Sequence, residues 1–213
     1  MRAVSDPTVL LRRVRALVAE GRTVALEPRT AAEADGLVDA VGGTDVVGEC
    51  RLTVPTARLR DAEVQTVAAR AEAAELPIDL AGPPARVGSL LAAIPTAGAV
   101  VAAAAPGAED ACRALGDGRV RLLGRFRPGL GARAADLAFV RCLNVLMAAG
   151  GHPGVATADP RLLAIAGERA AWHGRLAGSW EYVTTTDMRT AGARRLLATG
   201  QQVRVTVRAG EQA

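Results

Sequence analysis

Short apolar runs recur along the chain and alternate with longer amphipathic segments. Most of these runs contain β-branched residues, and they are nearly continuous in their hydrophobicity. Runs of this kind are typical of parallel strands that are covered on both faces. The predicted strands are 23–28, 49–54, 77–81, 99–104, 120–126, 154–159, 180–185 and 203–207. Strands that alternate with helical segments in this way predict βαβ units.

The segments between the strands carry apolar residues at helical spacing, together with the residues that start and stop helices. Thr30 followed by Glu33 forms a capping box, and Asp159 before Pro160 gives a second N-terminal signal. Gly200 suits the position just after a helix. The predicted helices are 7–20, 30–41, 61–74, 85–93, 106–115, 132–149, 160–171 and 187–199.

Eight strands at this spacing predict an α/β fold, namely a small (β/α)8 TIM-like barrel. We expect one domain over 1–213, with an N-terminal helix in 1–22, the barrel in 23–207 and a tail in 208–213. No helix is predicted after the last strand, so the helix in 7–20 either covers the bottom of the barrel or fills that gap. An open doubly wound sheet is the alternative, although the glycine spacing of a dinucleotide-binding fingerprint is missing.

The charged residues narrow the functional classes. The chain has 213 residues and a formal net charge of +4, and all 26 of its basic residues are arginines. Without lysine, Schiff-base chemistry and a P-loop are excluded. The arginines are scattered and aromatic residues make up 2% of the chain. Nucleic-acid binding needs clustered charge and stacking platforms, so we expect no nucleic-acid partner.

The cysteines and histidines predict neither disulfides nor a metal site. Cys50, Cys112 and Cys142 are far apart and form no CxxC pair, which favours reduced thiols in the cytoplasm. His152 lies between a glycine and a proline, where a loop is expected, and is far from His173. No apolar run reaches the ~20 residues of a membrane span, and the N-terminus has no apolar signal core. We therefore expect a cytoplasmic protein.

In such a barrel the functional residues lie at the carboxyl ends of the strands. The candidates there are Glu27, Thr53, Asp79, Arg121, Arg125, Thr157, Asp159, Glu181, Thr185 and Arg204. Asp79 and Arg121 are the most informative, because a buried charge needs a partner. They could bind a ligand together at the mouth, or form a structural ion pair. Asp159 is better explained as a helix cap, and Glu181 and Tyr182 are expected to point to opposite sides of their strand.

Several segments of the chain match one known family in order and spacing. Residues 139–160 read FVRCLNVLMAAGGHPGVATADP, a helix followed by a Gly-Gly-His-Pro turn and a strand. The other segments are PIDL at 77–80, VRLLG at 120–124, WEY at 180–182, RRL at 194–196 and QVRVTV at 202–207. Together they resemble proline dehydrogenase, the flavin-dependent enzyme that oxidises L-proline to pyrroline-5-carboxylate.

The resemblance implies a distorted (β/α)8 barrel that binds FAD at its carboxyl mouth and acts on a proline-like substrate. An arginine beside a flavin stabilises the negative charge of the reduced ring. Matched residue by residue, the catalytic residues are Asp79 and Arg121, and the cofactor-binding residues are Leu80, Gly124, Arg125 and Thr157.

The chain also departs from that family. Thr53 stands where the family has a lysine, Ala158 replaces a histidine, Thr186 replaces a tyrosine and an alanine run at 102–105 replaces Gln-Ala-Tyr. The family's closing helix, whose arginine pair clamps the substrate carboxylate, has no counterpart after the last strand. Two hypotheses follow. The chain is a flavin oxidoreductase with altered contacts, or it is a non-catalytic barrel that binds a protein partner or a second copy of itself.

Overall fold

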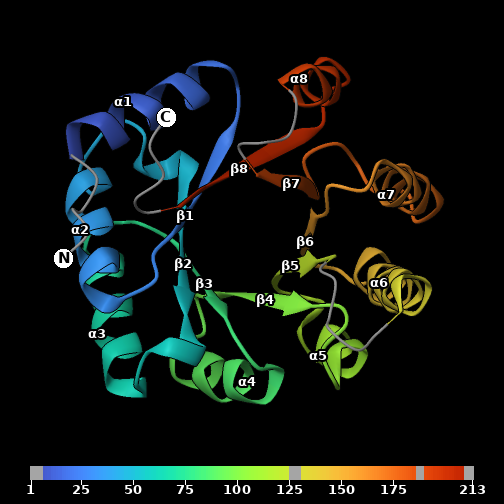
Figure 1. The fold of residues 1–213 in the computed structure, drawn as a ribbon, viewed down its shortest axis with the longest axis horizontal. Coiled ribbons are helices and arrows are strands. Elements are labelled where there is room, and N and C mark those ends of the chain that lie inside the picture. Colours follow the sequence, from blue (N-terminus) through green and yellow to red (C-terminus); the bar gives the residue numbers. More distant parts are fainter. Residues whose placement is uncertain (1–6, 125–130, 186–189, 209–213) are drawn as a thin grey trace.

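The computed structural model describes residues 7–124, 131–185 and 190–208, in which eight strands alternate with eight helices (Figure 1). The strands are β1 (Thr23–Glu27), β2 (Cys50–Pro55), β3 (Ile78–Ala81), β4 (Gly98–Ala102), β5 (Arg119–Leu123), β6 (His152–Ala156), β7 (Glu181–Thr185) and β8 (Gln202–Arg208). The helices are α1 (Pro7–Ala19), α2 (Ala31–Val41), α3 (Asp61–Ala73), α4 (Pro84–Ala93), α5 (Ala108–Leu115), α6 (Ala132–Ala148), α7 (Pro160–Trp172) and α8 (Thr190–Ala198).

The strands form a closed parallel barrel. Each strand pairs with the next one along the chain, and β8 pairs with β1 to complete the ring. The helices surround the strands as an outer layer (Figure 1). The predicted (β/α)8 barrel is therefore confirmed, and the open doubly wound sheet is wrong.

Local signals placed most helix ends correctly. The Thr30 side chain accepts a hydrogen bond from the backbone N–H of Glu33 at 3.1 Å, and Asp159 accepts one from the N–H of Arg161 at 2.8 Å. Gly200 follows α8 with a φ of +77°, a left-handed conformation that favours glycine. The prediction that Asp159 is a helix cap is thus confirmed.

Two local expectations are settled by packing. α1 packs against α2 and β1 in the outer ring, so it does not cover the bottom of the barrel (Figure 1). The glycine and proline neighbours of His152 predicted a loop. That prediction is wrong, because His152 is the first residue of β6. Its backbone N–H joins the sheet by donating to the carbonyl of Gly118 at 2.9 Å.

The strands have two different faces. Leu26, Leu52 and Leu80 are fully buried in the hydrophobic core that the strands share with the helices. The residues that alternate with them face the barrel interior. Arg121 on β5, for example, contacts side chains of β1 and β2, which are not its neighbours in the sheet. Such contacts cross the interior, which is therefore polar.

Candidate functional site

Charged side chains fill much of the barrel interior. A typical barrel of this kind packs its interior with Val, Ile and Leu, whereas here five arginines meet three carboxylates. The set consists of Arg51, Arg119, Arg121, Arg204, Arg208, Glu27, Asp79 and Glu181. Positive charge is in excess within this set, which favours a ligand that carries negative charge.

Arg121 lies at the centre of the cluster near the carboxyl ends of the strands. It is 3% exposed, and its Nη1 donates to Glu27 Oε1 at 3.3 Å. Its Nη2 donates to the hydroxyl of Thr53 and lies 3.8 Å from Asp79 Oδ2. Its Nε is buried and has no hydrogen-bond partner among the described residues. A buried donor left unpaired costs about 1–3 kcal/mol, so this atom is suited to an acceptor from a ligand.

Asp79 is held as a carboxylate beneath this arginine. Arg51 donates to Asp79 Oδ1 from Nε at 3.0 Å and from Nη2 at 2.8 Å. Burial raises the pKa of Asp79, but the positive charges of Arg51 and Arg121 outweigh it and leave the pKa below its usual value. The structure thus brings together the two residues that the sequence singled out, with Asp79 ionised at neutral pH.

A second ionic group lies deeper in the barrel, around Glu181. Its Oε1 accepts hydrogen bonds from Arg119 Nη1 at 3.1 Å and from Arg204 Nε at 3.0 Å. Tyr182 points to the other side of β7, where its ring packs against that of Trp180 with 4.5 Å between centroids. The predicted opposite orientations of Glu181 and Tyr182 are therefore confirmed.

Sequence reasoning missed Arg51 and Arg119. Each lies two residues before a recognised candidate on the same strand, Thr53 on β2 and Arg121 on β5. Side chains two apart on a strand share a face, so this spacing was a usable signal. Arg208 was missed as well, because it was assigned to the tail, whereas it ends β8 and its Nε lies 3.5 Å from Glu27 Oε2.

The predicted cofactor residues have different surroundings. Gly124 lines a cavity of about 120 Å³ with Phe139 and Leu162. A Cβ on Gly124 would stand 3.1 Å from the Phe139 ring and 3.2 Å from Thr157 Cβ, so a larger residue there would press on both neighbours. Thr157 is buried after β6, with its hydroxyl accepting from the N–H of Asp159.

Leu80 is fully buried in the helix-facing core, so its side chain points away from the barrel interior. Arg125 and Thr186 lie outside the described residues, as does the side chain of Thr185. The roles of Leu80, Gly124, Arg125 and Thr157 toward a cofactor stay predictions.

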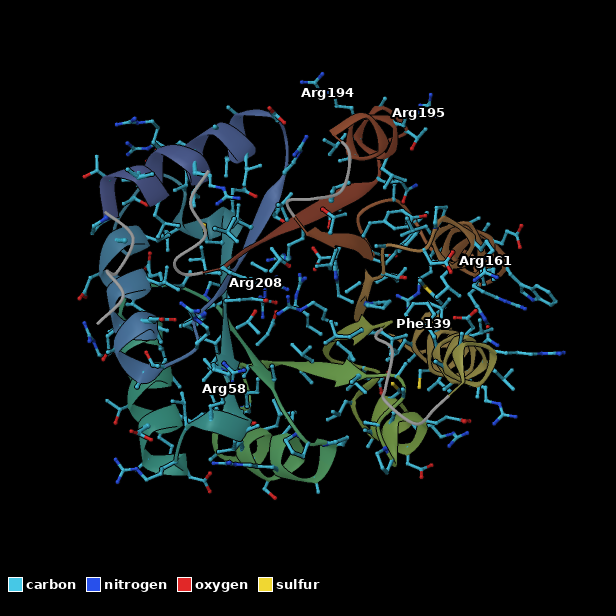
Figure 2. The ribbon with its side chains drawn as sticks, in the orientation of Figure 1. Arg58, Phe139, Arg161, Arg194, Arg195 and Arg208 are labelled. Atoms are coloured by element: carbon cyan, nitrogen blue, oxygen red, sulfur yellow. The ribbon has the colours of Figure 1, made fainter. Side chains whose placement is uncertain are left out.

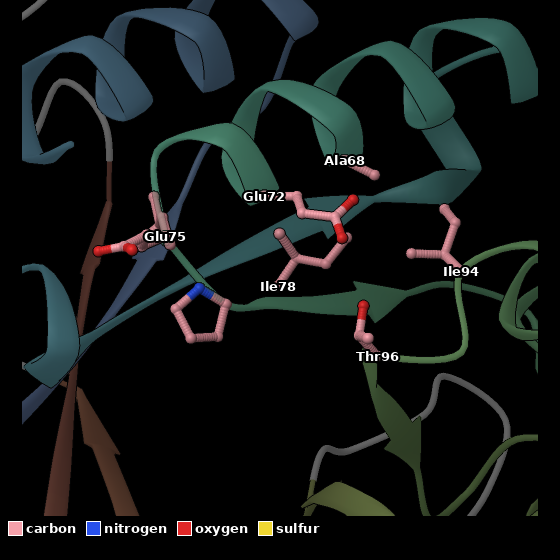
Figure 3. Close-up of a pocket in the computed structure, with 8 residues that line it drawn as sticks. Ala68, Glu72, Glu75, Ile78, Ile94 and Thr96 are labelled. Atoms are coloured by element: carbon pink, nitrogen blue, oxygen red, sulfur yellow. The ribbon is translucent and has the colours of Figure 1, made fainter. Parts of the chain in front are cut away.

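Other polar groups and cavities lie away from this site. Arg194 and Arg195 are exposed on α8 and point outward, whereas Arg208 lies toward the centre of the view (Figure 2). A cavity of about 330 Å³ lies at the amino ends of β3 and β4, between Glu72, Ile78 and neighbouring residues (Figure 3). It occupies the end of the barrel opposite to the one that carries function in this fold.

The part of the chain that the structure describes holds neither a metal-binding cluster nor a membrane-spanning helix. No group of three or more His, Cys, Asp or Glu side chains there is arranged to hold a metal ion. No helix within 7–124, 131–185 or 190–208 combines the length and hydropathy needed to cross a bilayer.

No family model matches the sequence, and no curated protein matches it. Solved structures do match. Proline utilization A (PutA) from Bdellovibrio bacteriovorus, inactivated by N-propargylglycine, superposes with a TM-score of 0.80 at 12% identity, over 97% of this chain and 30% of that one. PutA from Corynebacterium freiburgense gives a TM-score of 0.70 at 14% identity, over 96% and 28%. A citrate synthase variant gives 0.53 at 12% identity, over 92% and 90%.

Sequence identities of 12–14% establish a similarity of fold alone. This chain spans less than a third of the length of either PutA protein. Its barrel is similar to a portion of proline utilization A over nearly all of its own residues.

Proposed function

We propose that this barrel is an FAD-linked oxidoreductase that oxidises proline or a related cyclic secondary amine. The observation that supports the proposal best is Arg121, with a buried and unpartnered Nε, beside the ionised Asp79. Both occupy the strand positions that resemble the catalytic pair of proline dehydrogenase. The similarity of the barrel to proline utilization A over 97% of the chain supports the same assignment.

The residues at the mouth fit a flavin in two respects. The unpaired N–H of Arg121 needs an acceptor, and a flavin ring offers carbonyl oxygens. Gly124 borders a cavity near the carboxyl end of β5, and Thr157 lies beside Gly124; the two would hold the cofactor together with Leu80 and Arg125. When bound, FAD supplies the acceptor for a hydride.

The chain's own residues supply charge and orientation. Arg121 places a fixed positive charge where negative charge develops during reduction, and Glu27 and Thr53 hold its guanidinium in place. Asp79 keeps a negative charge at the mouth that attracts the cationic amine of a substrate. The excess of arginine in the interior favours a substrate that also carries a carboxylate.

The test is an absorbance spectrum of the purified protein after incubation with excess FAD and desalting. We expect retained flavin absorbance that is bleached by proline or another cyclic amine under anaerobic conditions. Arg121→Ala should lose the flavin, whereas Arg12→Ala, which removes an exposed arginine of α1, should keep it. A folded, monodisperse protein that retains no flavin contradicts the proposal.

A non-catalytic barrel is the second candidate, and three observations favour it. Partners within the chain already engage Asp79 and both terminal nitrogens of Arg121, and Thr53 and Ala158 replace the lysine and histidine of the family. Trp172 and Leu176 are 77% and 76% exposed near the end of α7, where a partner would cover them. This candidate predicts no flavin, together with concentration-dependent association in analytical ultracentrifugation that Trp172→Arg weakens.

A further inference from the structure

Two large apolar side chains are exposed within five residues of each other at the end of α7. Trp172 is the last residue of α7, and Leu176 lies in the turn that follows. Because α7 leads into β7, this segment lies at the amino ends of the strands, on the face opposite the mouth. Exposed apolar patches mark interaction sites, and tryptophan is enriched among the residues that dominate interfaces.

The turn that carries Leu176 is fastened to the neighbouring helix. The Arg175 guanidinium donates to four backbone carbonyls at the end of α6 and just beyond it, those of Leu146, Met147, Ala149 and Gly151. The backbone N–H of Arg175 also donates to the carbonyl of Ala170 at 2.8 Å. Trp172 and Leu176 are thus presented to solvent from a backbone that is held on both sides. An anchor ordered in advance loses little conformational entropy on binding.

A positive charge accompanies the two apolar residues. The Arg169 guanidinium lies over the Trp172 ring, with Cζ 5.1 Å from the ring centroid. Within the described part of the chain it has no carboxylate partner, since the adjacent Glu168 points to another side of the helix. We call Arg169, Trp172 and Leu176 the anchor. Its surface is apolar with one unpaired cation.

The same face of the barrel carries a groove of complementary character. This is the cavity of about 330 Å³ lined by the end of α3, the start of β3 and the turn between α4 and β4 (Figure 3). Leu76 and Ile78 give it a buried apolar floor. Glu72 and Glu75 line it as well, and both are exposed. Neither carboxylate has an ion pair or side-chain hydrogen bond with another described residue, so both are available to a cation from outside.

We propose that two copies of this chain associate through the amino-terminal faces of their barrels, each placing its anchor in the groove of the other. Trp172 and Leu176 cover the apolar floor, and Arg169 meets Glu72 and Glu75. The interface lies at the end of the barrel opposite the mouth, so the proposal does not rest on flavin binding or on its absence. It shares with the second candidate function only the exposure of Trp172 and Leu176.

Two-fold symmetry allows both contacts to form at once. α3 and α7 lie on opposite sides of the ring, so the groove and the anchor are separate patches of one face (Figure 1). A two-fold axis that lies in this face, midway between the patches, sets each patch against the other patch of the second copy. Such an interface contains every contact twice, and it closes at a dimer.

Sedimentation velocity of the full chain at a series of concentrations tests the proposal. We expect a reversible dimer with twice the chain mass of 21.8 kDa. Trp172→Ala should raise the dimer dissociation constant by at least about 30-fold, the effect of truncating an interface hot spot. Leu137→Ala is the matched control, because it removes an exposed apolar side chain of α6 and should leave the dissociation constant unchanged.

Charge reversal identifies the two patches. Glu72→Arg with Glu75→Arg makes the groove positive, and Arg169→Glu makes the anchor negative. Each variant alone sets like charges against each other at both contacts, so its dimer should weaken at least about tenfold. An equimolar mixture of the two variants pairs unlike charges at both contacts, so a mixed dimer should form with an affinity near that of the parent protein.

The control for charge reversal is Glu109→Arg with Asp110→Arg. It changes the net charge by the same amount in the first turn of α5, at the mouth end, and should leave the dimer unchanged. Each variant is first checked by circular dichroism, and Trp172→Ala decides the outcome if a charge variant fails to fold. A parent protein that stays monomeric up to its solubility limit, assembly that continues beyond a dimer, or a mixture that does not associate would overturn the proposal. Flavin absorbance is a separate readout, so a colourless dimer contradicts only the oxidoreductase.

Discussion

Replacing Glu181 with glutamine tests whether the interior charges stabilise the barrel as a group. Glu181 is the carboxylate that Arg119 and Arg204 share, and its side chain is 5% exposed. Glutamine keeps the size of the side chain but removes its charge, so the buried Arg204 and the partly buried Arg119 lose their anionic partner. Removing one member of a buried ion pair typically costs about 3–5 kcal/mol. Because the amide oxygen can still accept one hydrogen bond, we expect the lower end, about 3 kcal/mol.

Urea unfolding followed by circular dichroism at pH 7 measures this loss. For a chain of this size, about 3 kcal/mol corresponds to a fall in Tm of roughly 6–12 °C. Glu109→Gln is the matched control, because Glu109 pairs with Arg113 on the surface of α5. An exposed pair contributes about 0.3–0.5 kcal/mol. If Glu181→Gln lost no more stability than Glu109→Gln, the interior charges would not be coupled as the structure indicates.

A second substitution tests whether the unpaired cations cause the loss of stability. Adding Arg204→Met to Glu181→Gln removes one of the two unpaired cations, so the double variant should recover part of the lost stability. Glu181→Gln alone leaves Arg204 without its anionic partner, whereas Arg204→Met alone leaves Glu181 paired only with Arg119, so the two losses of stability should not add. Simple addition of the two losses would show that Arg204 and Glu181 act separately.

Three further outcomes follow from the same structure. Gly98→Ala should destabilise the protein by about 1–3 kcal/mol, because the new Cβ would overlap Asp79 Oδ1 and stand 3.3 Å from Arg51 Nη2. The control is Gly88→Ala, which lies in an open part of α4 and should stabilise the protein in the same urea assay. The pKa of Asp79 is lower in the folded than in the unfolded state, so its stabilising contribution is complete above the unfolded value near 3.8 and is lost as the pH falls through the folded value. The difference in unfolding free energy between the parent protein and Asp79→Asn should therefore shrink on acidification below pH 3.8, and a pH-independent difference would contradict the assignment. Burial raises the pKa of Tyr182, the single tyrosine, above 10, so the tyrosinate absorbance of the folded protein should appear at higher pH than that of urea-unfolded protein.

The fold could be predicted because each of its elements carries its own local signal. The run at 203–207 is apolar at alternate positions with β-branched residues, and it became β8. Thr30 and Glu33 specified the start of α2 through contacts within four residues. Closure of the ring between β8 and β1 did not follow from the number of strands, because eight strands also permit an open sheet; the missing dinucleotide-binding fingerprint favoured the barrel.

The candidate site was only half predictable, for a different physical reason. Asp79 stood out because a carboxylate in an apolar strand needs a partner, but that partner proved to be Arg51 as much as Arg121. Arginines on strands are common, and whether one faces the interior depends on the register of the whole barrel. The orientation of Leu80 depended on the register in the same way. A shift of one residue along a strand moves a side chain from the barrel interior to the helix-facing core, where Leu80 lies.

Small residues explain how this barrel accommodates long charged side chains. A Cβ on Gly98 would meet the Arg51–Asp79 pair, and one on Gly154 would stand 3.3 Å from Glu181 Oε1. β4 and β6 thus leave room that neighbouring strands fill with guanidinium and carboxylate groups. The glycines and the ion pairs are therefore one packing arrangement. Enlarging either glycine alone would press on the charged groups beside it, so Asp79 and Glu181 keep their positions only while Gly98 and Gly154 are present.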